Sequence, residues 1–80
     1  MAKTRIKLSF PAGLINEPII YNFGQTFEIV TNIKRANVEK KFGWVVLELT
    51  GTSDEIDRGI AWLGEKGVRV DPVDADIVEG

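Results

Sequence analysis

Residues 44–50 read Trp-Val-Val-Leu-Glu-Leu-Thr, and this stretch decides the fold class. Every second residue from Val45 to Leu49 is apolar and falls on one side of the chain. Side chains alternate between the two faces of a β-strand, so this period of two predicts a strand with one buried face. Trp44 and Val46 fall on the open face, where exposed apolar residues are typical of an interface.

The same alternation appears upstream, because residues 5–10 are apolar at every even position and predict another half-buried strand. The odd positions of this strand place Arg5 and Lys7 on the open face of the sheet. Near the other end of the chain, Val68 and Val70 alternate with charged residues and predict a strand there as well. Three strands of one sheet are therefore visible from alternation alone.

Residues 26–39 are rich in β-branched and aromatic residues and predict the remaining strand. Its alternation is interrupted, since Ile33 and Ala36 belong to opposite parities. A β-bulge between these two residues would bring both onto one face, because one extra residue exchanges the faces. Residues 40–43 then form the hairpin turn that leads into the strand at residues 44–50.

Two segments between the strands predict helices. The first begins with Asn16 as its cap and Pro18 in its first turn, and it ends at Gly24. The second is capped by Thr52 or Ser53 and carries an apolar stripe, Ile56, Ile60 and Leu63. The resulting order is β-α-β-β-α-β. This order predicts a ferredoxin-like α+β fold, in which a four-stranded antiparallel sheet carries two helices on one face.

The composition excludes several classes of function. The chain of 80 residues contains no cysteine and no histidine, which removes thiol nucleophiles and the commonest general base and metal ligand. No apolar segment is long enough for a membrane span or a secretory signal, so we expect a cytoplasmic protein without membrane insertion. Residues 1–41 carry a net charge of +4 and residues 42–80 one of −6, which gives −2 in total. We expect no enzymatic activity and no cofactor.

Two weaker motifs remain as alternatives. Residues 40–47 partly match the third-strand motif of RNA-recognition domains, with Trp44 as one stacking aromatic. Lys7 stands where the second aromatic would be, and base stacking needs more than one exposed ring. RNA binding is therefore the least favoured alternative. Asp71, Asp74 and Asp76 lie close together in the sequence, but they lack the glycine turn and loop length of a calcium site.

A wider set of short motifs resembles one known family, the NIL domain. The set comprises Phe10-Pro11, Pro18-Ile19-Ile20, Asn32-Ile33, residues 43–51 and Gly67-Val68-Arg69-Val70. The resemblance covers about residues 4–73. It implies a single NIL-like domain over residues 1–80, with an ordered core at 4–73 and an acidic C-terminal tail at 74–80.

The resemblance implies a regulatory module related to ACT domains. In bacterial methionine importers such a module ends the ATPase subunit, where two copies pair through their sheets and bind L-methionine near the interface. The asparagine that takes part in binding there corresponds to Asn32. A second branch of the family precedes an iron–sulfur ferredoxin module in proteins of homocysteine synthesis. This chain departs from the family pattern at Lys34, where the family name expects leucine, and its hairpin turn is shorter than in the transporter branch.

We therefore expect a ligand-sensing homodimer that binds methionine or a related sulfur amino acid at its interface. The expected ligand-binding residues are Asn32 as the polar anchor, Ile33, Lys34 and Arg35, and the expected interface residues are Trp44 and Val46. Lys34 or Arg35 would pair with the ligand carboxylate. The alternative is an interaction subunit without a ligand, which would dock on a ferredoxin, a sulfur-transfer enzyme or an ABC transporter component.

Overall fold

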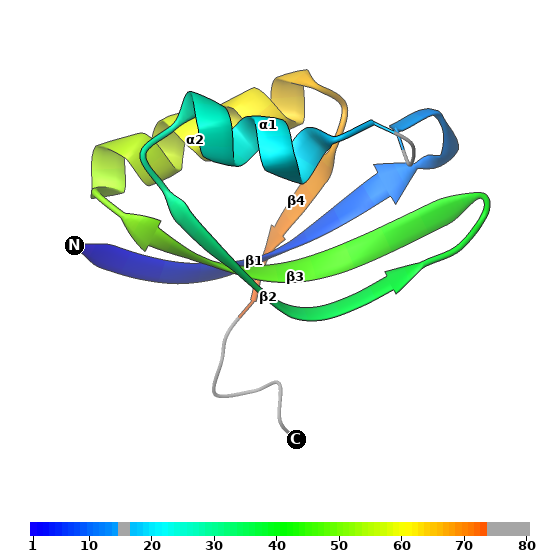
Figure 1. Cartoon of the computed structure of the whole chain (residues 1–80), viewed down its shortest axis with the longest axis horizontal. Coiled ribbons are helices and arrows are strands. Elements are labelled where there is room, and N and C mark those ends of the chain that lie inside the picture. The colour runs from blue at the N-terminus through cyan, green and yellow to red at the C-terminus, as the bar shows by residue number, and fades with distance from the viewer. Residues whose placement is uncertain (15–16, 74–80) are drawn as a thin grey trace.

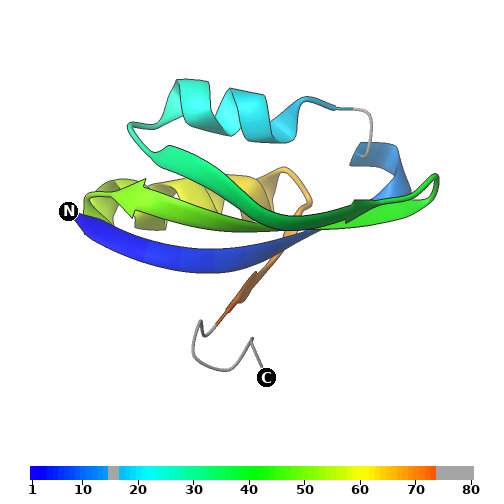
Figure 2. The ribbon, with the colours of Figure 1, turned by 60° about the horizontal axis from the view of Figure 1, so that its bottom comes forward.

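The computed structural model describes residues 1–14 and 17–73. The elements in chain order are β1 (Ala2–Pro11), a 3-10 turn (Ala12–Leu14), α1 (Ile19–Thr26), β2 (Val30–Val38), β3 (Phe42–Gly51), α2 (Ser53–Glu65) and β4 (Arg69–Pro72). They form a four-stranded antiparallel sheet in the order β2-β3-β1-β4. Both helices lie on one side of this sheet (Figures 1 and 2). The predicted ferredoxin-like α+β fold is confirmed.

Strand β3 lies inside the sheet and shows the predicted alternation. Val45, Leu47 and Leu49 are buried on the helix side, whereas Trp44 and Val46 are half-buried on the other side. Strand β3 pairs with β1 along its whole length and with β2 on its other edge. The face that points away from the helices, called the open face below, is therefore centred on Trp44 and Val46.

The predicted β-bulge is present in β2. Ile33 pairs with Leu47 and Arg35 pairs with Val46, so Lys34 is the extra residue of the bulge. The extra residue exchanges the faces, which places Ile33 on the helix side and Arg35 on the open face. Strand β2 is an edge strand of the sheet. The bulge and the cations Lys34 and Arg35 also protect this free edge from pairing with other strands.

The core lies between the two helices and the face of the sheet that points toward them. Its largest fully buried side chains are Phe23, Leu8, Leu47, Leu49 and Leu63. Trp62 of α2 is half-buried, and its ring centroid lies 6.2 Å from that of Phe23 and 5.9 Å from that of Phe27. Among the described residues, every buried polar side-chain atom has a hydrogen-bond partner.

The helix boundaries differ in part from the prediction. Helix α1 does not end at Gly24 but continues to Thr26, whose hydroxyl donates a hydrogen bond to the Asn22 carbonyl at 2.8 Å. Pro18 occupies the N-cap position of α1 without a side-chain cap, and the predicted cap, Asn16, lies outside the described residues. Thr52 caps α2 as one of the two predicted alternatives.

The turns and the last strand also position the open face. The β2–β3 turn is formed by residues 39–41 and is closed by a 2.8 Å hydrogen bond from the Glu39 amide to the Phe42 carbonyl, so Phe42 belongs to β3 rather than to the turn. Beyond β4, the Val73 amide donates to the Arg5 carbonyl at 3.1 Å. None of the described helices is long and apolar enough to cross a membrane.

Candidate functional site on the open face of the sheet

The open face consists of rows of side chains that cross the strands. One row contains Lys7, Val46 and Arg35, because Val46 of β3 pairs with Lys7 on one side and with Arg35 on the other. The next row contains Arg5, Glu48 and Asn32 in the same arrangement. An apolar centre is therefore flanked by cations in the first row, and a carboxylate is flanked by a cation and an amide in the second.

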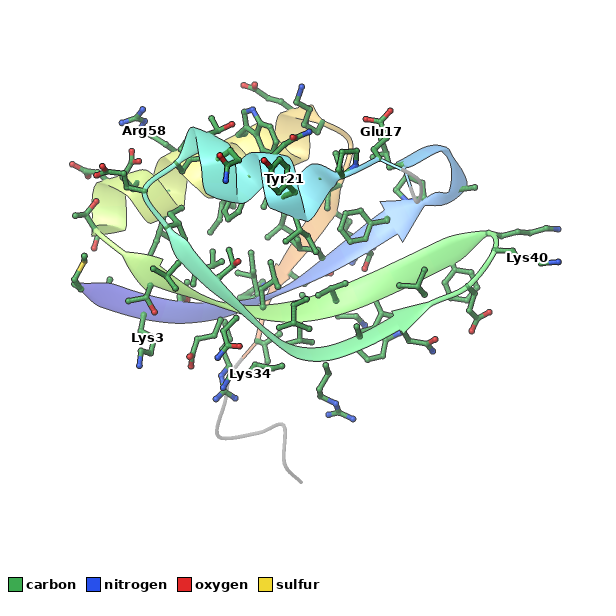
Figure 3. All side chains as sticks on the ribbon, in the orientation of Figure 1. Lys3, Glu17, Tyr21, Lys34, Lys40 and Arg58 are labelled. Carbon is green, nitrogen blue, oxygen red and sulfur yellow. The ribbon has the colours of Figure 1, made fainter. Side chains whose placement is uncertain are left out.

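Residues of both rows contribute to a shallow hollow of about 480 Å³, which is lined by Arg5, Lys7, Lys34, Arg35, Trp44, Val46 and Val73. This volume falls within the range of about 300–1,000 Å³ that is usual for small-molecule sites. Figure 3 shows Lys34 pointing away from the helices, whereas Tyr21 and Arg58 lie on the helix side. The residues of the hollow come from all four strands or their immediate continuation.

The hollow carries an excess of positive charge. Two of its four cations pair with the carboxylate of Glu48, which lies 3.5 Å from Arg5 Nε and 4.0 Å from Lys34 Nζ. The Lys7 ammonium lies 5.2 Å from the centroid of the Trp44 ring. Within residues 1–14 and 17–73, the remaining ion pair of this face joins Arg69 to Asp71 at 3.1 Å. The hollow is therefore suited to an anionic group beside an apolar one, although the whole chain carries −2.

The structure brings together most of the predicted site residues. Lys34, Arg35, Trp44 and Val46 all line the hollow. Asn32 lies on the same face, exposed and opposite Glu48, in the row next to the hollow. Ile33 lies on the helix side with 57% of its surface exposed, so it does not share a face with the other predicted ligand-binding residues.

Sequence reasoning placed Arg5 and Lys7 on the open face but did not assign them to the site. Their alternation with Ile6 and Leu8 was a sufficient signal for the face, and only the strand order showed that β1 lies beside β3. Val73 was missed for a different reason. It follows the last strand, and its place beside the hollow depends on the pairing of β4 with β1.

A second hollow, of about 190 Å³, lies on the helix side between α1 and the β2–β3 hairpin. Its lining is almost entirely apolar, with Glu17 as the charged member and with Phe10, Tyr21 and Val38 among the others. It contains no predicted site residue and no convergent set of polar groups, which small-molecule sites usually have. The open face is the better candidate site.

The candidate site combines charged, aromatic and apolar groups. The described residues contain no group of three or more carboxylates that could hold a metal ion. Two of the three aspartates weighed for a cation, Asp74 and Asp76, lie outside the described residues. The open face offers charge, an indole ring and an apolar floor, a combination that is suited to a small amphipathic ion or a partner surface.

Comparisons with known proteins agree with this fold. The family model of the NIL domain matches residues 4–72. The methionine import ATP-binding protein MetN of Coxiella burnetii is 30% identical over 70 residues, which cover 82% of this chain and 20% of that protein. The chain therefore spans about a fifth of this curated relative.

Solved structures show the same architecture at lower identity. The C-terminal domain of an ABC transporter ATP-binding protein from Enterococcus faecalis superimposes with a TM-score of 0.76 at 20% identity, covering 88% of this chain and 82% of that one. A de novo designed protein, Ferredog-Diesel, gives 0.54 at 13% identity and covers 91% and 85% of the two chains. The family model, which spans nearly all the described residues, decides the assignment: the chain belongs to the NIL domain family.

Proposed function

We propose that this protein is a non-enzymatic regulatory module that binds methionine or a related sulfur amino acid on the open face of its sheet. The observation that carries the proposal is the row Lys7–Val46–Arg35, an apolar centre between two cations with the Trp44 ring beside it. An amino acid with an apolar side chain needs these two kinds of surface next to each other. The NIL family assignment and the MetN relative direct the choice to methionine.

The geometry suggests a pose for the ligand. Arg35, with its planar fork of donors, would receive the carboxylate, and Lys34 would add a second charge. Glu48 would accept from the ligand ammonium, with the Asn32 amide opposite it. The thioether would lie against the Trp44 ring, since sulfur–aromatic contacts contribute about 0.3–1.5 kcal/mol.

A second copy of the chain would complete the site. The hollow is open on one side, and Trp44 and Val46 are half-buried there without a covering element among the described residues. A second open face laid over it would exclude water and strengthen the interactions with the ligand. Two cationic faces repel each other, so we expect the ligand carboxylates to favour this pairing. Binding of the ligand would then convert the module from monomer to dimer, and this change would be its regulatory signal.

The proposal is tested by calorimetric titration with L-methionine, norleucine and methionine methyl ester. Norleucine replaces the sulfur by a methylene, and the ester removes the carboxylate charge. We expect binding in the order methionine, norleucine, ester. Arg35→Gln should abolish measurable binding, whereas the control Arg58→Gln, on α2 at the helix side, should leave it unchanged. Equal binding by Arg35→Gln and wild type would reject the site.

The charge of the open face favours one second candidate, a docking function without a small ligand. The four cations of the hollow, two of which pair with Glu48, would also suit an acidic protein such as a ferredoxin, a sulfur-transfer enzyme or an ABC transporter ATPase subunit with an acidic surface. A stable complex with such a protein that weakens with salt, together with no response to any amino acid, would favour docking over sensing.

A further inference from the structure

A second aromatic side chain stands beside Trp44 on the open face. Strand β3 begins at Phe42, which precedes Trp44 by two residues and therefore points to the same side of the sheet. Phe42 has 51% of its surface exposed, and Trp44 is half-buried. The sequence offered only one ring for stacking, because Phe42 was expected in the hairpin turn. The structure provides two rings in succession at the hairpin end of the sheet.

These two rings occupy the first two aromatic positions of the third-strand motif of RNA-recognition domains. Residues 40–47 read Lys-Lys-Phe-Gly-Trp-Val-Val-Leu, and the motif reads basic, Gly, aromatic, Gly or Ala, aromatic, Val, any residue, aromatic. The last aromatic position is taken by Leu47, which is fully buried in the core. Such domains stack two or three bases on aromatic side chains of a four-stranded sheet. The need for more than one exposed ring is therefore met on β3 alone.

Polar side chains flank the Trp44 ring on the neighbouring strands. Asn37 of β2 and Ser9 of β1 are directly opposite Trp44, and Arg69 of β4 continues this row beyond Ser9. The Lys7 ammonium lies 5.2 Å from the centroid of the ring. The amide and the hydroxyl both donate and accept hydrogen bonds, as base edges require, and the two cations suit phosphate oxygens. A base on the ring thus has hydrogen-bonding groups and cations beside it.

The charges of the chain are divided between the two faces of the molecule. Among the residues that the structure describes, the open face carries six cations and two carboxylates, a net charge of +4: Lys3, Arg5, Lys7, Lys34, Arg35 and Arg69 against Glu48 and Asp71. Figure 3 shows Lys3 and Lys34 pointing away from the helices, and Lys40 at the tip of the hairpin. The face therefore attracts a polyanion although the whole chain carries −2.

We propose that the open face binds single-stranded nucleic acid, with two successive bases stacked on Phe42 and Trp44 and the phosphates among the surrounding cations. Every base has a π-face, so this mode of binding tolerates many sequences. A duplex is excluded, because its bases are already stacked on one another. This activity goes beyond the proposed function, and Trp44 belongs to both.

Fluorescence anisotropy with labelled oligomers of about ten nucleotides tests the proposal on the wild-type chain. The probes are oligouridylate, oligothymidylate, a duplex RNA, and an abasic deoxyribose oligomer with the same number of phosphates as the single strands. At about 50 mM NaCl we expect both single strands to bind more tightly than the duplex and the abasic oligomer. The tighter of the two single strands identifies RNA or DNA as the source, since only RNA carries the 2′-hydroxyl.

Loss of either ring should weaken binding of the base-bearing probes alone. Phe42→Leu and Trp44→Leu keep an apolar side chain and remove the ring, so each should lower the affinity for oligothymidylate about 5-fold or more. Neither should change the affinity for the abasic oligomer. Tyr21→Leu, at an exposed aromatic of α1, is the matched control and should change neither. Lys7→Gln should weaken both probes and reduce the salt dependence of binding.

The two tryptophans of the chain give a readout that needs no variant. Trp44 lies on the open face, whereas Trp62 of α2 packs against Phe23 and Phe27 on the helix side. Addition of oligothymidylate should shift the indole N–H signal of Trp44 in a proton–nitrogen spectrum and leave that of Trp62 in place. A shift confined to Trp62 would overturn the proposal, because the strand would then bind elsewhere.

Three further results would overturn it. One is the absence of binding to both single strands at about 50 mM NaCl. Another is equal affinity for oligothymidylate and the abasic oligomer, which means that charge alone holds the probe. The third is an unchanged affinity in both ring variants. No amino acid is present in these measurements, so the proposal can fail without the proposed function failing.

Discussion

The Lys7 ammonium lies 5.2 Å from the centroid of the Trp44 ring, across the boundary between β1 and β3 on the open face. Ser9 is the residue directly opposite Trp44, so the contact runs diagonally to the next residue on that face. A cation–π contact of this kind contributes about 0.5–1 kcal/mol at an exposed site. The pair joins the apolar floor of the hollow to its cationic rim, which is the combination that an amphipathic anion requires.

Trp44→Ala should weaken methionine binding while the fold persists. The ring is half-buried on the open face and contributes nothing to the core between sheet and helices. Loss of the sulfur–aromatic contact should lower the affinity roughly 2- to 10-fold, measured by calorimetric titration. Tyr21→Ala removes an exposed aromatic from α1 and serves as the control, with no expected change. Equal affinities of Trp44→Ala and wild type would remove the ring from the site.

Glu48→Gln should change the affinities of two ligands in opposite directions. The carboxylate of Glu48 pairs with Arg5 and Lys34, and in the proposed pose it also receives the ligand ammonium. Its neutralisation should lower the affinity for L-methionine about 2- to 5-fold. It should raise the affinity for 4-(methylthio)butanoate, which lacks the ammonium, by a similar factor. A titration in which both ligands shift in the same direction would contradict the pose.

Gly59→Ala should destabilise the fold, whereas Gly64→Ala in the same helix should not. A Cβ at Gly59 would lie 2.7 Å from Phe23 Cε1 and 3.0 Å from Ile29 Cδ1, so either α2 or the buried Phe23 ring must shift. We expect a loss of about 1–3 kcal/mol in the free energy of unfolding, measured by denaturant titration. At Gly64 the added methyl meets nothing, and alanine should stabilise by about 0.4–1 kcal/mol. Equal stabilities would show that the helices pack less closely than described.

Thr52→Ala should lower the free energy of unfolding by about 1 kcal/mol through the loss of a helix cap. The Thr52 hydroxyl accepts a hydrogen bond from the Glu55 amide at 3.2 Å, at the start of α2. Ser53→Ala is the matched control, because Ser53 is already helical and alanine is the better helix former. Thermal unfolding should give a lower midpoint for Thr52→Ala than for Ser53→Ala. A lower midpoint for Ser53→Ala would show that Thr52 is not the cap.

Strands β1 and β3 were predictable from the sequence because one face of each is buried and the other is not. Alternation around Val45 and Leu47 revealed β3, and the change of parity between Ile33 and Ala36 correctly indicated the bulge at Lys34. The end of α1 was predicted too early, because Gly24 is a usual stop signal and the closing contacts of Thr26 leave no mark on the apolar pattern. Local patterns were sufficient wherever burial alone set the structure.

The candidate site was predictable only in part, since it depends on strand order. The resemblance to the NIL family singled out Asn32, its neighbours Ile33, Lys34 and Arg35 were added to it, and open-face alternation singled out Trp44 and Val46. Nothing local in the sequence shows that Lys7 and Arg35 flank the same residue of β3, because that relationship arises from two separate pairings. Ile33 follows Asn32 in the sequence yet lies on the opposite face, as neighbouring residues of a strand must.

Thermal unfolding of the wild-type chain with L-methionine, homocysteine and a panel of other amino acids tests the central claim most directly. Ligand at about 100 times its dissociation constant stabilises the folded state by about 2.7 kcal/mol. For a chain of this length, that should raise the unfolding midpoint by about 10 °C or more. A rise confined to the sulfur amino acids is the predicted result. An unchanged midpoint with every amino acid at millimolar concentration would contradict the sensing function.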